Sequence, residues 1–302
     1  LPIGIRPAGI RPTARSEPYT VYHIFPEIST ACPPFLSDFR KNFSRFIVFC
    51  PLSCYNERRK EVFPPFRRGI SPMDLLLRFL EKTAWEMTPP EPYGTFHLVF
   101  WLTGLPIAFL AAFFLRKISD KTDRRLLFSV GFVLLLAEAY KQLFYTFIVG
   151  GGEYQFDRIP FQLCSMPMYA CLILPFLKPG KCRQALYTFT ASFGFMGGFV
   201  SYFSPESMCL PYWTLTLHSF SWHMILVFIG LYLFFSGRAG NRLRDFPPAA
   251  AVYFCLCVVA FGINLLCYRC PGPDVNMFYV GPKPSPLVIC RDNVARFGWA
   301  VN

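Results

Sequence analysis

Long runs of apolar residues, separated by short polar stretches, occupy most of the chain after residue 93. A helix that crosses the hydrocarbon core of a bilayer needs roughly 20 such residues. Six runs reach about that length: Gly94–Leu115, Leu126–Val149, Ile159–Leu177, Ala185–Phe203, Tyr212–Phe235 and Pro248–Tyr268. We therefore predict an all-α fold, a polytopic membrane helix bundle of about six transmembrane helices.

The composition supports this prediction and narrows the choice of partners. Of the 302 residues, 53% are hydrophobic, 18% aromatic and only 16% charged, which is more apolar than a soluble domain requires. The formal net charge of +12 is not accompanied by a Lys/Arg-rich helix or an aromatic stacking motif, so we expect no nucleic-acid partner. Membrane lipids are the expected partners, and the sequence leaves the oligomeric state open.

The polar stretches between the apolar runs alternate in charge. Arg116–Arg125, Lys178–Arg183 and Gly237–Asp245 are basic, whereas Gly150–Asp157 and Ser204–Pro211 contain neither Lys nor Arg. Basic loops of membrane proteins remain on the cytoplasmic side. This rule predicts a multi-pass protein of the cell membrane, with the N-terminus and the segment after the last span outside.

The chain before the first span has a different character. Residues 1–72 hold 11 prolines and 11 Lys/Arg against 5 Asp/Glu, and the first methionine of the sequence is Met73. This segment is expected to be disordered or not genuinely translated. We expect a short lead-in at 73–93, the transmembrane bundle at 94–287 and an irregular tail at 288–302.

Polar side chains inside the predicted spans are informative, because a central charge costs about 2.5–3.5 kcal/mol to insert. The second span contains Glu138, Lys141 and Gln142, which share one helix face at spacings of three and four residues. Their role remains open between a structural ion pair near the helix end and the wall of a polar pocket.

The fifth span carries two histidines, His218 and His223. A spacing of five residues turns them about 140° apart on a helix, so they do not form a two-ligand zinc face. His223 shares a polar-leaning face with Thr216 and Ser219, and we favour it as the functional histidine. His218 is a second pocket candidate, and each could instead be a hydrogen-bonded packing group. Because the sequence contains no metal-binding or nucleotide-binding motif, we expect no metal and no cofactor.

The third span opens with a proline, Pro160, which suits the first turn of a helix. Gln162, Cys164 and Ser165 would then occupy the next turn. These groups could satisfy backbone donors or assist close helix packing. Alternatively, Cys164 is a nucleophile and His223, from a neighbouring span, is its base.

Two asparagines complete the set of candidates. Asn264 lies in apolar surroundings near the end of the sixth span, where a buried amide needs a hydrogen-bond partner. Asn276 follows in a Pro/Gly-rich loop. We assign both to the candidate pocket.

Several ordered stretches between Met73 and Leu287 together resemble the YwaF family of integral membrane proteins, related to the eukaryotic transmembrane-protein-164 acyltransferases. The stretches are "AEAYKQLFY", "IPFQLCSMPMY", "GFMGGFVSYFSP", "WHMILVFIGLYL", "GINLLCY" and "NMFYVGPKPSPL". The resemblance implies movement of acyl chains between phospholipids through a cysteine and a histidine. The chain departs from the eukaryotic Pro-Cys-His motif, because Phe161 and Gln162 follow Pro160. Its ending also departs, since a further apolar span is expected there, so the bundle is expected to lack a last helix.

Two hypotheses follow for the function. In the first, the protein is an intramembrane acyltransferase-like enzyme in which Cys164 is the nucleophile and His223 the base. The pocket residues would be Glu138, Lys141, Gln142, Gln162, Ser165, His218, Asn264 and Asn276. In the second, the same groups serve a non-catalytic membrane protein, either a small-solute transporter or a binding or structural component.

Overall fold

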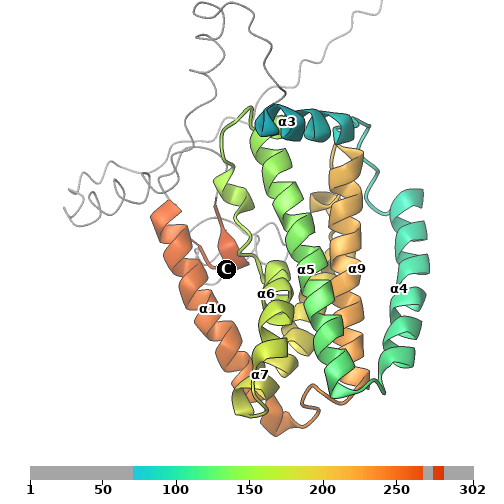
Figure 1. Cartoon of the computed structure of the whole chain (residues 1–302), viewed down its shortest axis with the longest axis vertical. Helices are drawn as coiled ribbons and strands as arrows, with labels where there is room; N and C mark the ends of the chain where they lie inside the picture. The colour runs from blue at the N-terminus through green and yellow to red at the C-terminus, as the bar shows by residue number, and fades with distance from the viewer. Residues whose placement is uncertain (1–70, 268–274, 282–302) are drawn as a thin grey trace, which may run out of the picture. The chain divides into compact units, whose positions relative to one another are not determined.

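The computed structural model describes residues 71–267 and 275–281, and among these residues the secondary structure is helical, without strands. The expected all-α fold is confirmed (Figure 1). The α-helices are α3 (Pro72–Thr83), α4 (Thr95–Leu115), α5 (Asp120–Phe144), α6 (Met166–Ile173), α7 (Lys181–Phe189), α8 (Phe195–Val200), α9 (Trp213–Phe235) and α10 (Phe246–Cys267). Apart from Ser71 and Pro72, the predictions for 1–72 and for the tail at 288–302 lie outside the described residues.

Within residues 71–267 and 275–281, four helices are long and apolar enough to cross a membrane. They span Thr95–Leu115, Asp120–Val149, Trp213–Phe235 and Leu243–Cys267. In the most apolar stretch of each helix, 50% of the residues are buried in Trp213–Phe235, whereas 11–22% are buried in the other three helices. Helix α9 therefore forms the centre of the bundle and packs against α4, α5 and α8 (Figure 1). The chain is an integral membrane protein of the helical type.

The third expected span differs from the prediction. Residues 159–162 are not helical, and helix begins with the 3₁₀ turn Leu163–Ser165, which leads into α6. Pro167, not Pro160, occupies the first turn of the α-helix. Proline has no N–H and its ring excludes the carbonyl four residues earlier, so Pro167 starts a new helix rather than continuing one. The first-turn assignment of Pro160 is wrong.

The fourth expected span is helical from Lys181 to Phe203 but changes geometry on the way. A π-helical segment, Thr190–Gly194, separates α7 from α8. At Gly198 the α8 backbone approaches α9 closely: a Cβ atom there would lie 2.8 Å from the carbonyl oxygen of His223. Small residues permit such close packing of membrane helices.

The three basic loops meet at one end of the bundle (Figure 1). Arg238 donates a hydrogen bond of 2.8 Å to the carbonyl of Ile118, and Gln184 donates one of 2.9 Å to the carbonyl of Arg238. We refer to this as the basic end. The three basic loops lie at the same end, as the charge pattern predicted. The side of the membrane that this end faces remains a prediction.

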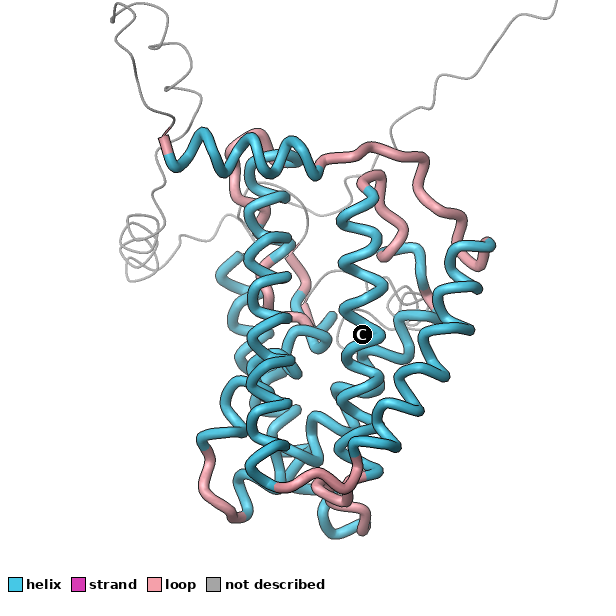
Figure 2. Tube along the Cα trace, turned by 45° about the vertical axis from the view of Figure 1, so that its right-hand side comes forward, coloured by secondary structure: helices cyan, strands magenta, loops and turns pink. Residues whose placement is uncertain are grey.

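Helix α3 runs across the opposite end of the bundle (Figure 2). Ser71 and Asp74 form a capping box at its start, which satisfies free donors of the first turn. Its buried Leu80 packs in a cluster with Phe144 and Leu215, from α5 and α9. Thus α3 covers the ends of the two central helices, in the manner of an amphipathic helix at a membrane interface.

Candidate functional site

Cys164 lies in the 3₁₀ turn that precedes α6, where the broken third span enters the bundle. Its carbonyl oxygen accepts a hydrogen bond of 3.0 Å from Trp222 Nε1 on α9. On the other side, a Cβ atom at Gly197 of α8 would lie 3.7 Å from the Cys164 nitrogen. Ser165, which follows Cys164 in the same 3₁₀ turn, is 4% exposed. The cysteine is therefore fixed between α8 and α9.

Glu138, Lys141 and Gln142 interact with one another as their spacing predicted. Lys141 Nζ lies 2.8 Å from Glu138 Oε2, and Gln142 Nε2 donates a hydrogen bond of 2.7 Å to Glu138 Oε1. Glu138 is 3% exposed, so the ion pair offsets much of the desolvation of its carboxylate. Both Lys141 and Glu138 also interact electrostatically with the Cys164 thiol. Glu138 and Lys141 thus form an ion pair that acts on Cys164, and Gln142 is hydrogen-bonded to the carboxylate of that pair.

His223 has a defined orientation on α9. Its Nδ1 lies 2.7 Å from the carbonyl oxygen of Ser219. Because a carbonyl only accepts, Nδ1 carries the proton and the neutral ring keeps a basic Nε2. The imidazole also lies within electrostatic range of Lys141. His223 therefore has the tautomer that a proton acceptor requires.

His218 is close to the same lysine. Its ring stacks on Trp222 at a centroid distance of 5.4 Å, lies beside the Ala137 carbonyl of α5, and interacts electrostatically with Lys141 and His223. Among the described residues, no partner hydrogen-bonds to His218 Nε2. Lys141 is thus a neighbour of both histidines and of Cys164, although no hydrogen bond between described side chains joins the thiol to either ring.

Gln162, Asn264 and Asn276 form a second polar group. Gln162 Nε2 donates to the Asn276 carbonyl at 3.1 Å, and Asn264 Nδ2 donates to the Met277 carbonyl at 2.9 Å. The Asn276 side chain accepts from the Gly281 amide at 2.9 Å. Asn264 therefore has the partner that its burial requires, and the segment 275–281 folds back against the start of the third span.

Two tyrosines near Glu138 were missed from the sequence. Tyr169 donates a hydrogen bond of 3.0 Å to the carbonyl of Pro160, and both Tyr154 and Tyr169 lie within electrostatic range of Glu138. Burial, together with the Glu138 carboxylate, raises the pKa of Tyr154 to about 12. Aromatic residues are common in membrane helices and loops, so no sequence signal separated these two from the rest.

A buried acid at the basic end was also missed. Asp123 is fully buried and accepts hydrogen bonds from Tyr187 at 2.7 Å and from Tyr232 at 2.6 Å. Arg238 Nε lies 3.1 Å from the same carboxylate. The sequence assigned Asp123 to a basic loop, but α5 begins at Asp120 and carries Asp123 into its first turns.

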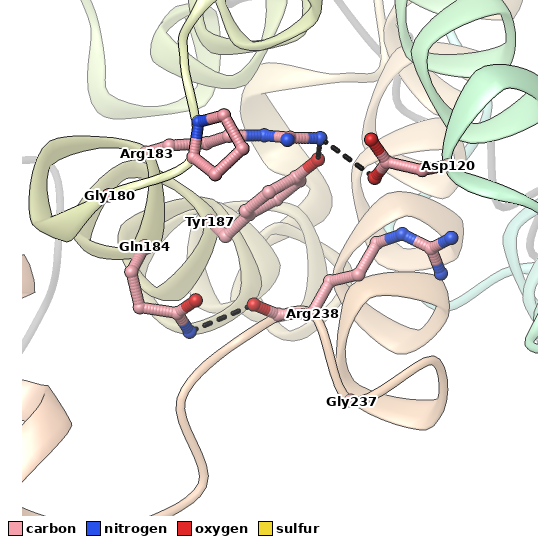
Figure 3. Close-up of a pocket in the computed structure, with 8 residues that line it drawn as sticks. Asp120, Gly180, Arg183, Gln184, Tyr187, Gly237 and Arg238 are labelled. Atoms are coloured by element: carbon pink, nitrogen blue, oxygen red, sulfur yellow. Dashed lines mark hydrogen bonds and ion pairs between the residues drawn. The ribbon is translucent and has the colours of Figure 1, made fainter.

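Figure 3 shows a shallow pocket at the basic end, whose lining includes Asp120, Tyr187 and Arg238. Arg183, 6% exposed, donates to the Tyr187 hydroxyl at 2.7 Å and to Asp120 at 3.1 Å. Gln184 points toward the Arg238 carbonyl across the pocket. Arg183 forms an ion pair with Asp120, and Arg238 forms one with Asp123. This network therefore connects α5, α7 and the α9–α10 loop.

The candidate residues therefore fall into two neighbouring groups. Glu138, Lys141, Gln142, Cys164, Ser165, His218 and His223 surround one polar region, and Gln162, Asn264 and Asn276 hold the segment 275–281 beside it. Within the part of the chain that the structure describes, no three His, Cys, Asp or Glu side chains gather as metal ligands.

The fold and the site define a helical membrane protein with a polar region inside its bundle. A family model described as the TMEM164 family matches residues 92–294. The match covers most of the chain, and the chain belongs to this family. Comparison with curated proteins and with solved structures gave no significant match.

Proposed function

We propose that the chain is an intramembrane acyltransferase-like enzyme that moves an acyl chain between membrane lipids, with Cys164 as the nucleophile and His223 as the base. The observation that carries the proposal is the position of Trp222, the residue before His223 on α9: its indole donates a hydrogen bond of 3.0 Å to the Cys164 carbonyl, and its ring stacks on His218. Lys141 of α5 interacts electrostatically with the same cysteine and both histidines. Three segments distant in sequence thus contribute a thiol, two imidazoles and a cation to one polar region.

Each group has a chemical role in such a reaction. A thiol attacks as its thiolate, which a nearby cation stabilises. His223 Nε2 can take the proton, because Nδ1–H already donates to Ser219. A general base needs to reach the nucleophile in the reacting complex, and this contact is often long or absent before the substrate binds.

The reaction then runs in two balanced halves. The Cys164 proton passes to His223, the sulfur bonds to the acyl carbonyl carbon, the ester C–O bond breaks, and the leaving alcohol takes the proton from His223. In the second half, His223 takes the proton from a second lipid hydroxyl, its oxygen bonds to the acyl carbon, and the C–S bond breaks. The proton returns to Cys164, and neither half consumes an oxidant or a cofactor.

The position of the polar region along the bundle supports a lipid substrate. Lys141 stands in the last turn of α5, away from the basic end, and the outer faces of α4 and α10 are apolar. In this proposal the protein lies in the cell membrane with its basic loops in the cytoplasm. The acyl chain would then come from the outer leaflet. The YwaF branch is the proposed place of the chain within its relatives.

The test is acylation of Cys164 in the purified protein, reconstituted in vesicles that contain a phosphatidylcholine with an alkyne-tagged acyl chain. We expect a hydroxylamine-sensitive label on Cys164 and transfer of the tag to added lysophospholipid. Cys164→Ala should abolish both. Cys182→Ala, which removes an exposed cysteine of the basic end, is the matched control and should change neither.

An unlabelled Cys164 would reject the enzyme. The non-catalytic alternative would then be examined by solute uptake into the same vesicles, which separates a transporter from a binding or structural component.

A further inference from the structure

The shallow pocket of Figure 3 lies at the basic end, where helix α7 begins. Its volume is about 180 Å³, whereas one water molecule needs only about 10–15 Å³ of such space. Two glycines of its lining, Gly180 and Gly237, would meet no atom within 4 Å if they carried a Cβ atom. The pocket is therefore large enough for a group of several heavy atoms, and it is open at both glycines.

The start of α7 can supply hydrogen-bond donors to a ligand in this pocket. The helix begins after Gly180, and no side chain caps its first turn. The first backbone amides of a helix have no partner within the helix, and together with the helix dipole they favour an anion. Because Gly180 lines the pocket, an anion bound there would lie at the uncapped end of α7.

A buried arginine is the second feature that points to an anion. Arg183 lines the pocket and is 6% exposed. Its hydrogen bonds to described residues all use Nη2, and its Nε is buried with no partner among those residues. A buried donor without an acceptor carries a desolvation cost. An oxygen ligand that reaches this guanidinium would recover that cost.

The charge of the basic end also favours an anionic ligand. The three basic loops hold 11 Lys/Arg against three Asp/Glu. Asp120, the acid in the lining of the pocket, lies 3.1 Å from Arg183 and 3.4 Å from Arg124, so two arginines balance its charge. An anion that approaches the pocket is therefore attracted by an excess of positive charge.

We propose that this pocket binds a phosphate group, held by the first-turn amides of α7 and by the Arg183 guanidinium. Helix N-termini and arginines are both common ligands of phosphate oxygens. Such a group can come from two sources at this end of the bundle, the headgroup of an anionic phospholipid in the adjoining leaflet or a free phosphate anion. Basic pockets between transmembrane helices bind anionic headgroups in this way. The proposal does not depend on acyl transfer at Cys164.

The test is titration calorimetry of the full chain, purified in detergent, with three probes. They are dioctanoyl-phosphatidylglycerol, dioctanoyl-phosphatidylcholine as the zwitterionic reference, and inorganic phosphate. We expect one bound probe per chain. Tighter binding of phosphatidylglycerol than of both other probes would support the lipid headgroup, and tighter binding of inorganic phosphate would support the free anion.

Two substitutions form a matched pair that locates the bound group. Gln184→Glu and Asn241→Asp each replace an exposed amide of the basic end by a carboxylate, but only Gln184 lines the pocket. Gln184→Glu should weaken binding of the preferred probe about 10-fold or more through repulsion of like charges. Asn241→Asp should change it by less than about twofold, because an exposed charge farther away is screened.

A third variant, Gly180→Leu, tests the pocket without a change of charge. Its side chain would occupy the open space at the start of α7, so binding should again weaken about 10-fold. Thermal unfolding of each variant without probe verifies that it is folded.

Three results would overturn the proposal. The first is that neither phosphatidylglycerol nor inorganic phosphate binds to the unmodified chain. The second is an equal weakening in Gln184→Glu and Asn241→Asp, which would show a general effect of the basic surface. The third is unchanged binding in Gly180→Leu, which would place the bound group outside the pocket.

Discussion

The indole of Trp222 donates a hydrogen bond of 3.0 Å to the carbonyl oxygen of Cys164. This contact joins the centre of α9 to the irregular start of the third span, 58 residues earlier in the chain. On its other side, the Trp222 ring stacks with His218. One side chain thus fixes the backbone of the candidate nucleophile and packs against one of the two histidines.

Trp222→Phe should weaken the fold and the site together. The substitution keeps an aromatic ring but leaves the Cys164 carbonyl without its donor, which should lower the free energy of unfolding by about 1–2 kcal/mol. Denaturant titration of the purified protein measures this loss. Trp101→Phe is the control, because Trp101 Nε1 is buried with no partner among the described residues. The free energy of unfolding of Trp101→Phe should be close to that of the unmodified chain. An equal decrease in both variants would contradict a stabilising role of the Trp222 hydrogen bond.

Lys141→Met should be strongly destabilising, because it leaves the buried Glu138 carboxylate without its cation. Breaking a buried ion pair in this way costs about 3 kcal/mol. The double variant Glu138→Gln/Lys141→Met should recover most of the free energy of unfolding. It should not recover acylation of Cys164, since the thiolate then lacks the ammonium. Full recovery of acylation would reduce Lys141 to a structural partner of Glu138.

The Asp123 network should affect stability but not chemistry. Asp123→Asn removes the charge that faces Arg238 and Arg183, and should lower the free energy of unfolding by about 3 kcal/mol. Asp120→Asn is the matched control, because the Asp120 side chain is 62% exposed and exposed ion pairs contribute about 0–1 kcal/mol. Acylation of Cys164 by the folded fraction should be unchanged in both variants. A selective loss of acylation in Asp123→Asn would connect the basic end to the site.

Alkaline pH should destabilise the fold partly through Tyr154. Its pKa is raised from 10 to about 12 by burial and by the Glu138 charge, so the folded state holds the phenol proton more tightly than the unfolded chain. The stabilisation is therefore complete below pH 10 and is lost as the pH rises through 12, by about 1–2 kcal/mol for a partly exposed group. Unfolding measured between pH 9 and 12 should show a shallower loss in Tyr154→Phe than in the unmodified chain. Tyr93→Phe, at a tyrosine that is 52% exposed, should follow the unmodified chain, and coinciding curves for all three would reject this role.

Much of the candidate site could be anticipated because its signals are local. Glu138, Lys141 and Gln142 share a face through helical spacing alone, and that spacing brings them into contact. Asn264 was identified because an amide in an apolar run requires a partner. The identity of that partner, the backbone of Met277, depends on how the chain returns after α10.

The sequence by itself determined the long apolar helices that suit a membrane, four of which lie among the described residues. The free energy of burying an apolar run is a sum over about 20 adjacent residues and needs no distant contact. Only the tertiary structure decided where helix begins in the third expected span and that Asp123, among the acids of its loop, is buried. It also decided that the segment 275–281 returns to Gln162, which accepts a hydrogen bond from the Phe278 amide. Those features depend on hydrogen bonds and ion pairs between residues 60 to more than 100 positions apart. Directional contacts of this kind form only after the helices have packed, and no periodicity along the chain encodes them.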